Sequence, residues 1–281
     1  MHEQQSLDQF DDPPLPSQSL PPSTPLPSGW RLIWSDEFDS AAGTVPDRTK
    51  WTPEIGGGGW GNQELEYYTN NHNAQQDGNS NLVIEAREEK PINAHCWYGP
   101  CRYTSARLIT KRKFEFTYGQ VEARIKLPSG QGIWPGFWML GQDIDTVGWP
   151  NNGEIDICEN IGREPATIHA AIHGPNYAAA DGISGAYSLA KGRFADEYHL
   201  FAVEWNMHRI AFFVDGINYF TVTRATVVRR GKWVYNHPFY LLLNVAVGGN
   251  WPGNPDDSSI YPQHMLVDYV RVYQQQEGSS S

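Results

Sequence analysis

The segment Gly153–Asn160 (GEIDICEN) constrains the fold more than any other part of this 281-residue chain. Its three carboxylates, Glu154, Asp156 and Glu159, are interleaved with Ile, Ile and Cys, a pattern that indicates a β-strand with one polar face. On a regular strand Glu154 and Asp156 share a face, whereas Glu159 points the other way because its offset is odd. A β-bulge near Ile157-Cys158 would insert one residue and bring all three acids to one face.

Three acids on one strand face have a chemical use. Glycoside hydrolysis needs two carboxylates that flank one bond, one as nucleophile or base and the other as acid. A third carboxylate can tune the other two by its charge and by hydrogen bonding. The alternative is a solvated strand face that carries acids by chance. Like charges along one face repel each other, so the fold gains nothing from stacking three of them, and this favours a functional site.

The composition favours a β-rich protein with a neutral partner. The chain has 11 Trp, 14 Tyr and 11 Phe with 27 Gly and 20 Pro, which suits strands and tight turns and disfavours long helices. The formal net charge is −11, so nucleic acid and anionic membranes are poor candidates for a partner. Exposed Trp and Tyr would suit sugar rings, although most aromatic side chains pack in a core. We see no apolar run long enough to span a membrane and no signal-peptide core.

Strand-like segments extend over most of the chain. Residues 1–28 are rich in Pro, Ser and Gln, and we expect a disordered tail or linker there, followed by one domain over 29–274 and a frayed end at 275–281. Residues 121–127 alternate apolar and polar side chains, which predicts a half-buried strand. Asp215-Gly216 predicts a two-residue hairpin turn between two strands.

A dozen or more strands, with no sustained helical period and no internal repeat, predict a single all-β domain. Residues 239–247 form a long apolar run that suits a central strand. The simplest architecture is a two-sheet antiparallel β-sandwich of jelly-roll type with an open concave cleft, along which a polymer can lie.

The three cysteines predict one disulfide and one free thiol. Cys96 and Cys101 enclose four residues, a loop that a disulfide could close, and neither has a His or Cys partner at zinc-binding spacing. A disulfide would imply an oxidising, secreted setting. Cys158 lies within the acidic strand, and we expect it to be a buried free thiol.

Taken together, several segments resemble glycoside hydrolase family 16, and within it the bacterial endo-1,3-β-glucanases, or laminarinases. They occur in the family's order between residues 30 and 273: Asp36–Asp39 (DEFD), Gly61–Thr69 (GNQELEYYT), Tyr103–Leu108 (YTSARL), Gly132–Leu140 (GIWPGFWML), Gly153–Glu159 (GEIDICE), Ile172–Gly174 (IHG), Gly248–Gly253 (GGNWPG) and Val267–Tyr273 (VDYVRVY). The spacing E-x-D-x-x-E resembles the laminarinase branch, whereas the lichenase and xyloglucan-active branches mostly carry E-x-D-x-E. The one departure in this motif is Cys158, where the family usually has Met or another apolar residue.

The resemblance implies a jelly-roll fold, catalysis with retention, and roles for the three acids. Glu154 would be the nucleophile, Glu159 the acid/base and Asp156 a helper of Glu154. No redox or nucleotide cofactor is implied. The family often carries a structural calcium ion, and the matching positions are Glu37, the carbonyl of Gly78, and Asp268, whose alternative interpretation is ordinary surface acids.

The resemblance also implies a set of sugar-binding residues: Trp134, Trp138 and Trp251 as aromatic platforms, Asn62, Glu64 and Arg107 as groups that bind hydroxyls or brace the nucleophile, and His173 as a cleft histidine. Each has a structural alternative, such as core packing for a Trp or a turn position for Asn62. Trp149 also lies near the acidic strand, but we rank it lower.

These observations predict a secreted, monomeric, endo-acting hydrolase of β-1,3-glucans such as laminarin. One alternative is a non-catalytic β-glucan-binding protein on the same fold, but relatives of that kind have lost the acids, and all three are present here. Another is a hydrolase of mixed-linkage β-glucan or of a galactan, since galactan-cleaving relatives can share the bulged motif. The segments around Trp134 and Asn62 favour glucan.

Overall fold

The computed structural model describes residues 29–276. The predicted tail 1–28 and all but two residues of the predicted frayed end lie outside this range. The strands form two large sheets and one small hairpin, and the predicted all-β jelly-roll sandwich is confirmed. Within residues 29–276 no helix has the length and apolarity needed to cross a bilayer.

The larger sheet has ten strands in the order β17-β16-β15-β10-β19-β5-β8-β3, with β1 beside β19 and β4 beside β5. Its strands are β1 (Trp30–Asp36), β3 (Glu66–Tyr68), β4 (Ala74–Gln76), β5 (Leu82–Glu88), β8 (Tyr103–Ser105), β10 (Gly119–Lys126), β15 (His199–Trp205), β16 (Arg209–Val214), β17 (Ile217–Thr223) and β19 (Gln263–Gln275). Its pairings are antiparallel except that of β3 with β8.

The second sheet has seven antiparallel strands in the order β14-β13-β12-β11-β18-β9-β2. They are β2 (Thr52–Glu54), β9 (Arg107–Ile109), β11 (Ile133–Gly141), β12 (Glu154–Glu159), β13 (Thr167–His173), β14 (Ile183–Ser188) and β18 (Phe239–Val247). The remaining elements are the hairpin β6 (His95–Cys96) with β7 (Gly99–Pro100) and the short helices α1 (Ile144–Val147), η1 (Ala179–Asp181) and α2 (Arg224–Val227).

One hydrophobic core lies between the two sheets, because alternate residues of each strand point into it. From the ten-stranded sheet it takes Val121, Ala123 and Ile125 of β10, which confirms the predicted half-buried strand. From the seven-stranded sheet it takes alternate residues of β11 and β18, among them Phe137 and Leu243. The residues between them therefore lie on the outer face of the seven-stranded sheet.

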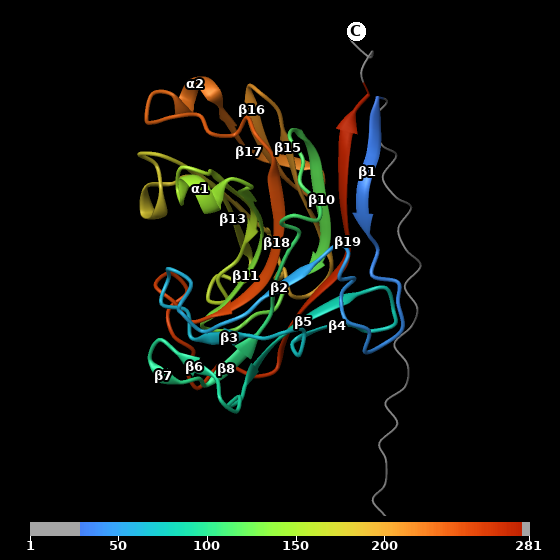
Figure 1. The fold of residues 1–281 in the computed structure, drawn as a ribbon, viewed down its shortest axis with the longest axis vertical. Coiled ribbons are helices and arrows are strands. Elements are labelled where there is room, and N and C mark those ends of the chain that lie inside the picture. The colour runs from blue at the N-terminus through green and yellow to red at the C-terminus, as the bar shows by residue number, and fades with distance from the viewer. Residues whose placement is uncertain (1–28, 277–281) are drawn as a thin grey trace, which may run out of the picture.

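The outer side of the seven-stranded sheet carries a small apolar cluster, the helix α1 and the β6-β7 hairpin. Every residue of β18 is buried, as predicted for a central strand. Tyr240 and Leu242 of β18 form a second, smaller apolar cluster with Ile109 and Leu140 on this outer side. Figure 1 shows that α1 and the β6-β7 hairpin lie to the same side of β18 but well apart from each other.

The predicted hairpin turn at Asp215-Gly216 is confirmed between β16 and β17. Both residues have positive φ, +50° and +78°, as the two central residues of a type I′ turn require. A glycine at the second position makes this conformation inexpensive.

The predicted pattern of cysteines is also confirmed. Cys96 and Cys101 form a disulfide across the β6-β7 hairpin, and Cys158 is a buried free thiol. The disulfide closes a loop of four residues at the edge of the molecule.

Peptide mapping by mass spectrometry without reductant tests this pairing. We expect one cross-linked peptide that joins Cys96 to Cys101 and an unmodified Cys158, which reacts with a thiol reagent only after unfolding because it is buried. Two free thiols at 96 and 101 in protein prepared under oxidising conditions would contradict the structure.

Candidate active site

The acidic strand β12 carries the predicted bulge. Against β11, Asp156 pairs with Trp138 and Cys158 pairs with Phe137, so Ile157 is the extra residue. The register against β13 also contains one extra residue between Asp156 and Glu159. Since the core takes Ile157 and Cys158 together, the alternation of the strand restarts after them and Glu159 points to the outer face.

Each carboxylate of β12 has an aromatic or imidazole partner. The indole Nε1 of Trp149 donates a hydrogen bond to Glu154 Oε2 over 2.7 Å, and that of Trp134 donates to Glu159 Oε1 over 3.1 Å. His173 of β13 is the register partner of Glu154. Its Nε2 atom lies 3.1 Å from Asp156 Oδ2 and 4.0 Å from Glu154 Oε1. Glu154, Asp156 and His173 therefore form one compact cluster, and Glu159 extends it along the same face.

Burial makes these acids hold protons more tightly than acids in water. Burial, and then the neighbouring Asp156, raise the pKa of Glu154 from 4.5 to about 8. Burial likewise raises the pKa of Asp156 to about 7. The pKa of Glu159 is raised well above its ordinary value, first by burial and then by repulsion from both Asp156 and Glu154. Glu159 is therefore suited to keep a proton that it can donate.

A second group of predicted residues surrounds Arg107 of β9. Its guanidinium carbon lies 4.7 Å from the ring centroid of Trp60 and equally far from that of Trp138, so the cation is held between two indoles. Its Nε donates to Glu54 on the neighbouring strand β2 over 2.5 Å. The indole of Trp138 donates to Asn244 Oδ1 of β18 over 2.7 Å.

Glu64 belongs to a buried hydrogen-bond chain rather than to the surface. Asn62 donates to Glu64 Oε1 over 3.1 Å, and the hydroxyl of Tyr68 donates to Glu64 Oε2 over 3.1 Å. The amide of Asn244 in turn donates to the Tyr68 hydroxyl over 3.0 Å. Glu64 thus links the loop that bears Asn62 to the strand that orients Trp138, which suits a bracing role.

Trp251 is brought to the Glu159 end of the cluster. Its ring centroid lies 5.5 Å from that of Trp134 and 5.0 Å from that of His169, both in edge-to-face geometry. His169 pairs with Glu159 in the register of β13. The predicted aromatic residues therefore lie beside the acids, Trp134 and Trp251 next to Glu159 and Trp138 in register with Asp156 and in contact with Arg107.

Sequence reasoning missed several members of the site. Trp149, which we ranked low, is the direct partner of Glu154. Trp60 and Asn244 were not predicted, although Trp60 directly precedes the segment that bears Asn62. The fully buried Glu66 was also missed: burial, and then repulsion from Glu64, raise its pKa well above its ordinary value, and Oε2 accepts from the Val247 amide.

The positions predicted for calcium carry arginine contacts. Both carboxylate oxygens of Glu37 accept from Arg271, over 3.0 and 2.8 Å, and Asp268 Oδ2 accepts from Arg124 over 2.7 Å. Arg271 thus already neutralises the Glu37 carboxylate. A calcium ion at Glu37, Gly78 and Asp268 stays a prediction, and no step of the chemistry depends on it.

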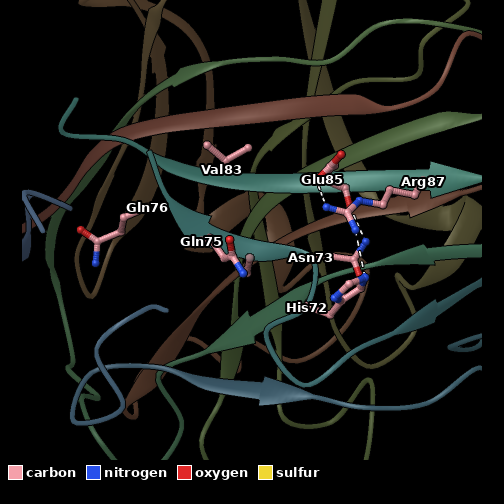
Figure 2. Close-up of a pocket in the computed structure, with 8 residues that line it drawn as sticks. His72, Asn73, Gln75, Gln76, Val83, Glu85 and Arg87 are labelled. Carbon is pink, nitrogen blue, oxygen red and sulfur yellow. Dashed lines mark hydrogen bonds and ion pairs between the residues drawn. The ribbon is translucent and has the colours of Figure 1, made fainter. Parts of the chain in front are cut away.

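A separate polar pocket lies on the outer face of the ten-stranded sheet (Figure 2). Glu85 and Arg87 of β5 alternate with core residues, so they point away from the core. Figure 2 shows Arg87 between Glu85 and His72, and its guanidinium lies 2.5 and 2.9 Å from their nearest atoms. The opposite charges of Arg87 and Glu85 in this pocket pair with each other, whereas the three acids of β12 have one imidazole beside them.

Comparison with known proteins agrees with this geometry. Residues 61–271 match the model of the glycosyl hydrolases family 16. A β-glucanase of Rhodothermus marinus is 41% identical over 254 residues, which cover 87% of this chain and 85% of that protein. The chain belongs to glycoside hydrolase family 16.

Solved structures of this family resemble the chain closely. The catalytic domain of an endo-1,3-β-glucanase (laminarinase) from Thermotoga petrophila has a TM-score of 0.83 and 46% identity, over 88% of this chain and 99% of that one. The endo-β-1,3-glucanase from Pyrococcus furiosus has a TM-score of 0.82 and 49% identity, over 89% and 96%. Three other curated relatives are longer, and the chain spans 35%, 39% and 57% of their lengths.

The raised pKa values of the three acids predict that their ionised forms lower the free energy of unfolding. The folded protein binds the proton of Glu154 more tightly than the unfolded chain does, so this group stabilises the fold below about pH 4.5 and loses that contribution as the pH rises towards about 8. Replacement Glu154→Gln removes the charge. We therefore expect the variant to unfold at a higher temperature than the wild type at pH 8, by roughly 2–4 °C for each 1 kcal/mol gained.

Thermal unfolding of both proteins between pH 4 and pH 8 measures this difference. The advantage of Glu154→Gln should shrink as the pH falls, because the wild-type carboxyl becomes neutral. Glu197→Gln, at an exposed position, serves as the matched control and should show no such trend. An advantage that does not change with pH would contradict the assignment of the cost to a buried charge.

Proposed function

We propose that this chain is an endo-acting, retaining hydrolase of β-1,3-glucosidic bonds in laminarin-type β-glucans. The observation that carries the proposal is the bulge of β12, which turns Glu159 to the face that bears Glu154 and Asp156. The similarity to laminarinases of Thermotoga and Pyrococcus over nearly their whole solved chains supports the substrate class.

In the first step Glu159 acts as the acid and Glu154 as the nucleophile. Glu159 donates its proton to the glycosidic oxygen, which leaves on the shortened chain, while a carboxylate oxygen of Glu154 forms a bond to the anomeric carbon. The raised pKa of Glu159 supports this role, since the group must be protonated when the substrate arrives. The indole of Trp134 orients the Glu159 carboxyl.

Glu154 must be ionised to attack, and two of its neighbours, Trp149 and His173, favour the anion. The Trp149 indole donates a hydrogen bond to it, and the positive charge of a protonated His173 would lower its pKa. Asp156 lies on the same face two residues along, next to Glu154 and His173, where it would act as the helper of the nucleophile. In the second step Glu159, now a base, takes a proton from water, which displaces Glu154 from the sugar with overall retention.

The aromatic groups beside the acids would supply platforms for sugar rings. Trp134 and Trp251 would support the rings next to Glu159, and Trp138 with Arg107 those towards β9. Asn62 would bind a hydroxyl while it donates to Glu64. We propose that the protein acts as a monomer outside the cell, and the Cys96–Cys101 disulfide supports an oxidising setting.

The variants Glu154→Gln and Glu159→Gln test the assignment. We expect each to lower kcat on laminarin by at least about 100-fold, because an amide neither attacks the sugar nor donates the proton. Reducing-sugar release measures the rate, and calorimetric binding of a glucan oligosaccharide shows whether the site is intact. A variant that keeps most of its rate would contradict its role, and equal activity of the wild type on curdlan and barley glucan would widen the substrate class to mixed linkages.

Azide rescue distinguishes the two roles. With Glu154→Ala, azide should occupy the place of the nucleophile and give a glycosyl azide of inverted configuration. With Glu159→Ala, azide should attack the glycosyl-enzyme and give a retained product. Nuclear magnetic resonance of the isolated azides reads the configuration. The opposite pattern would exchange the roles of Glu154 and Glu159.

A further inference from the structure

The β6-β7 hairpin holds an aromatic side chain that the proposed mechanism does not use. Trp97 lies in the four-residue loop that the Cys96–Cys101 disulfide closes, and 50% of its surface is exposed. A Trp that served only to pack the hairpin would be expected to bury most of its ring. Packing of the hairpin therefore does not explain why half of the Trp97 surface is exposed.

The hairpin is fastened to the glycine-rich loop at residues 56–59. The amide of Trp97 donates to the carbonyl of Gly57 over 2.8 Å. A Cβ at Gly57 would lie 2.5 Å from Cys96 Sγ, and one at Gly59 would lie 2.8 Å from the Trp97 ring. Only glycine permits this approach, so the loop and the hairpin fit each other closely.

The polar edge of the Trp97 ring is already satisfied. Its Nε1 donates to the Glu64 carbonyl over 2.7 Å, and the hydroxyl of Tyr98 donates to the Leu65 carbonyl over 2.6 Å. The Tyr98 ring packs edge-to-face on Trp97, with centroids 5.5 Å apart. The disulfide and these contacts fix the ring in one orientation. The Trp97 side chain therefore loses little conformational entropy when a ligand stacks on it.

Trp97 is connected to the site at the Arg107 end. Its indole contacts the backbone of Glu64, whose side chain accepts from Asn62. The same loop carries Trp60, which packs on Arg107. Contacts thus run outward from Trp138 to Arg107 and from Arg107 to Trp60, whose loop holds the hairpin. The loop of Trp251 meets the same segment, since the amide of Asn250 donates to the Asn62 carbonyl over 2.8 Å.

We infer that Trp97 is the aromatic platform of an outer sugar subsite, which binds a pyranose ring of a glucan chain that extends beyond Arg107 and Trp60. This inference rests on the proposed function and adds to it a preference for longer chains. An apolar ring face held still at the end of a row of sugar-binding residues is the surface on which the carbon-bound hydrogens of a β-glucose ring stack.

Calorimetric binding in the Glu154→Gln background tests the subsite without hydrolysis. The ligands are a β-1,3-glucan hexasaccharide and the corresponding trisaccharide. We expect Trp97→Ala to weaken hexasaccharide binding by about fivefold to tenfold, equivalent to about 1–1.4 kcal/mol, and to change trisaccharide binding by less than about twofold. Trp97→Phe, which keeps a ring, should restore most of the affinity. Ile92→Ala, at a 90% exposed position, is the control and should change neither affinity.

The outcomes separate the inference from the proposed function. Equal weakening for both ligands would overturn the subsite, because Trp97 would then act only through the placement of Glu64 and Asn62. Unchanged affinities with a lower unfolding temperature would also overturn it and leave Trp97 a packing role. Failure of the Glu154→Gln protein itself to bind either glucan would overturn the proposed function, and the subsite with it.

Discussion

The site depends on one extra residue in strand β12. Without it, the spacing of Glu159 from Glu154 would send the third carboxylate into the core between the sheets. With Ile157 inserted, two apolar residues turn inwards together and the next side chain emerges on the outer face. The bulge interrupts the hydrogen-bond ladder locally. Regular pairing with β11 and β13 before and after the bulge keeps the interruption short. A backbone irregularity thus assembles a pair of carboxylates that regular strand geometry could not assemble at this spacing.

The same face concentrates charge where a stable fold would avoid it. Burial raises the pKa of all three acids, and repulsion raises the pKa of Glu154 and Glu159 further, while indole N–H groups and one imidazole offset part of this effect. This is an unfavourable use of buried surface for stability and a favourable one for acid–base chemistry, because a proton held by Glu159 is a proton available at the glycosidic oxygen. Under the proposed function Trp134, which donates to Glu159, would also support a sugar ring, so one side chain would both orient an acid and bind the substrate.

The sequence predicted the features that depend on local spacing. Parity showed that the three acids could share a face only with a bulge, the Asp215-Gly216 pair specified its turn, and cysteine spacing indicated the disulfide. It could not predict features that depend on which strands become neighbours. Arg107 lies between Trp60 and Trp138 because β9 and the glycine-rich loop meet beside β11 and β18. The sequence around each of these residues carries no pattern that predicts this contact. The role of Trp149 was underestimated for the same reason, since the turn after α1 brings it back over the acidic strand.

The stereochemistry of the first product tests the central claim most directly. If the bulge brings Glu154 and Glu159 to the two sides of one glycosidic bond at about 5–5.5 Å, hydrolysis must proceed through a glycosyl-enzyme with retention. Proton magnetic resonance during the first minutes of laminarin hydrolysis, before the released sugar mutarotates, distinguishes the anomers. We predict that the β anomer appears first and the α anomer later. Initial release of the α anomer would mean that the acids are too far apart for Glu154 to attack, and would contradict the account.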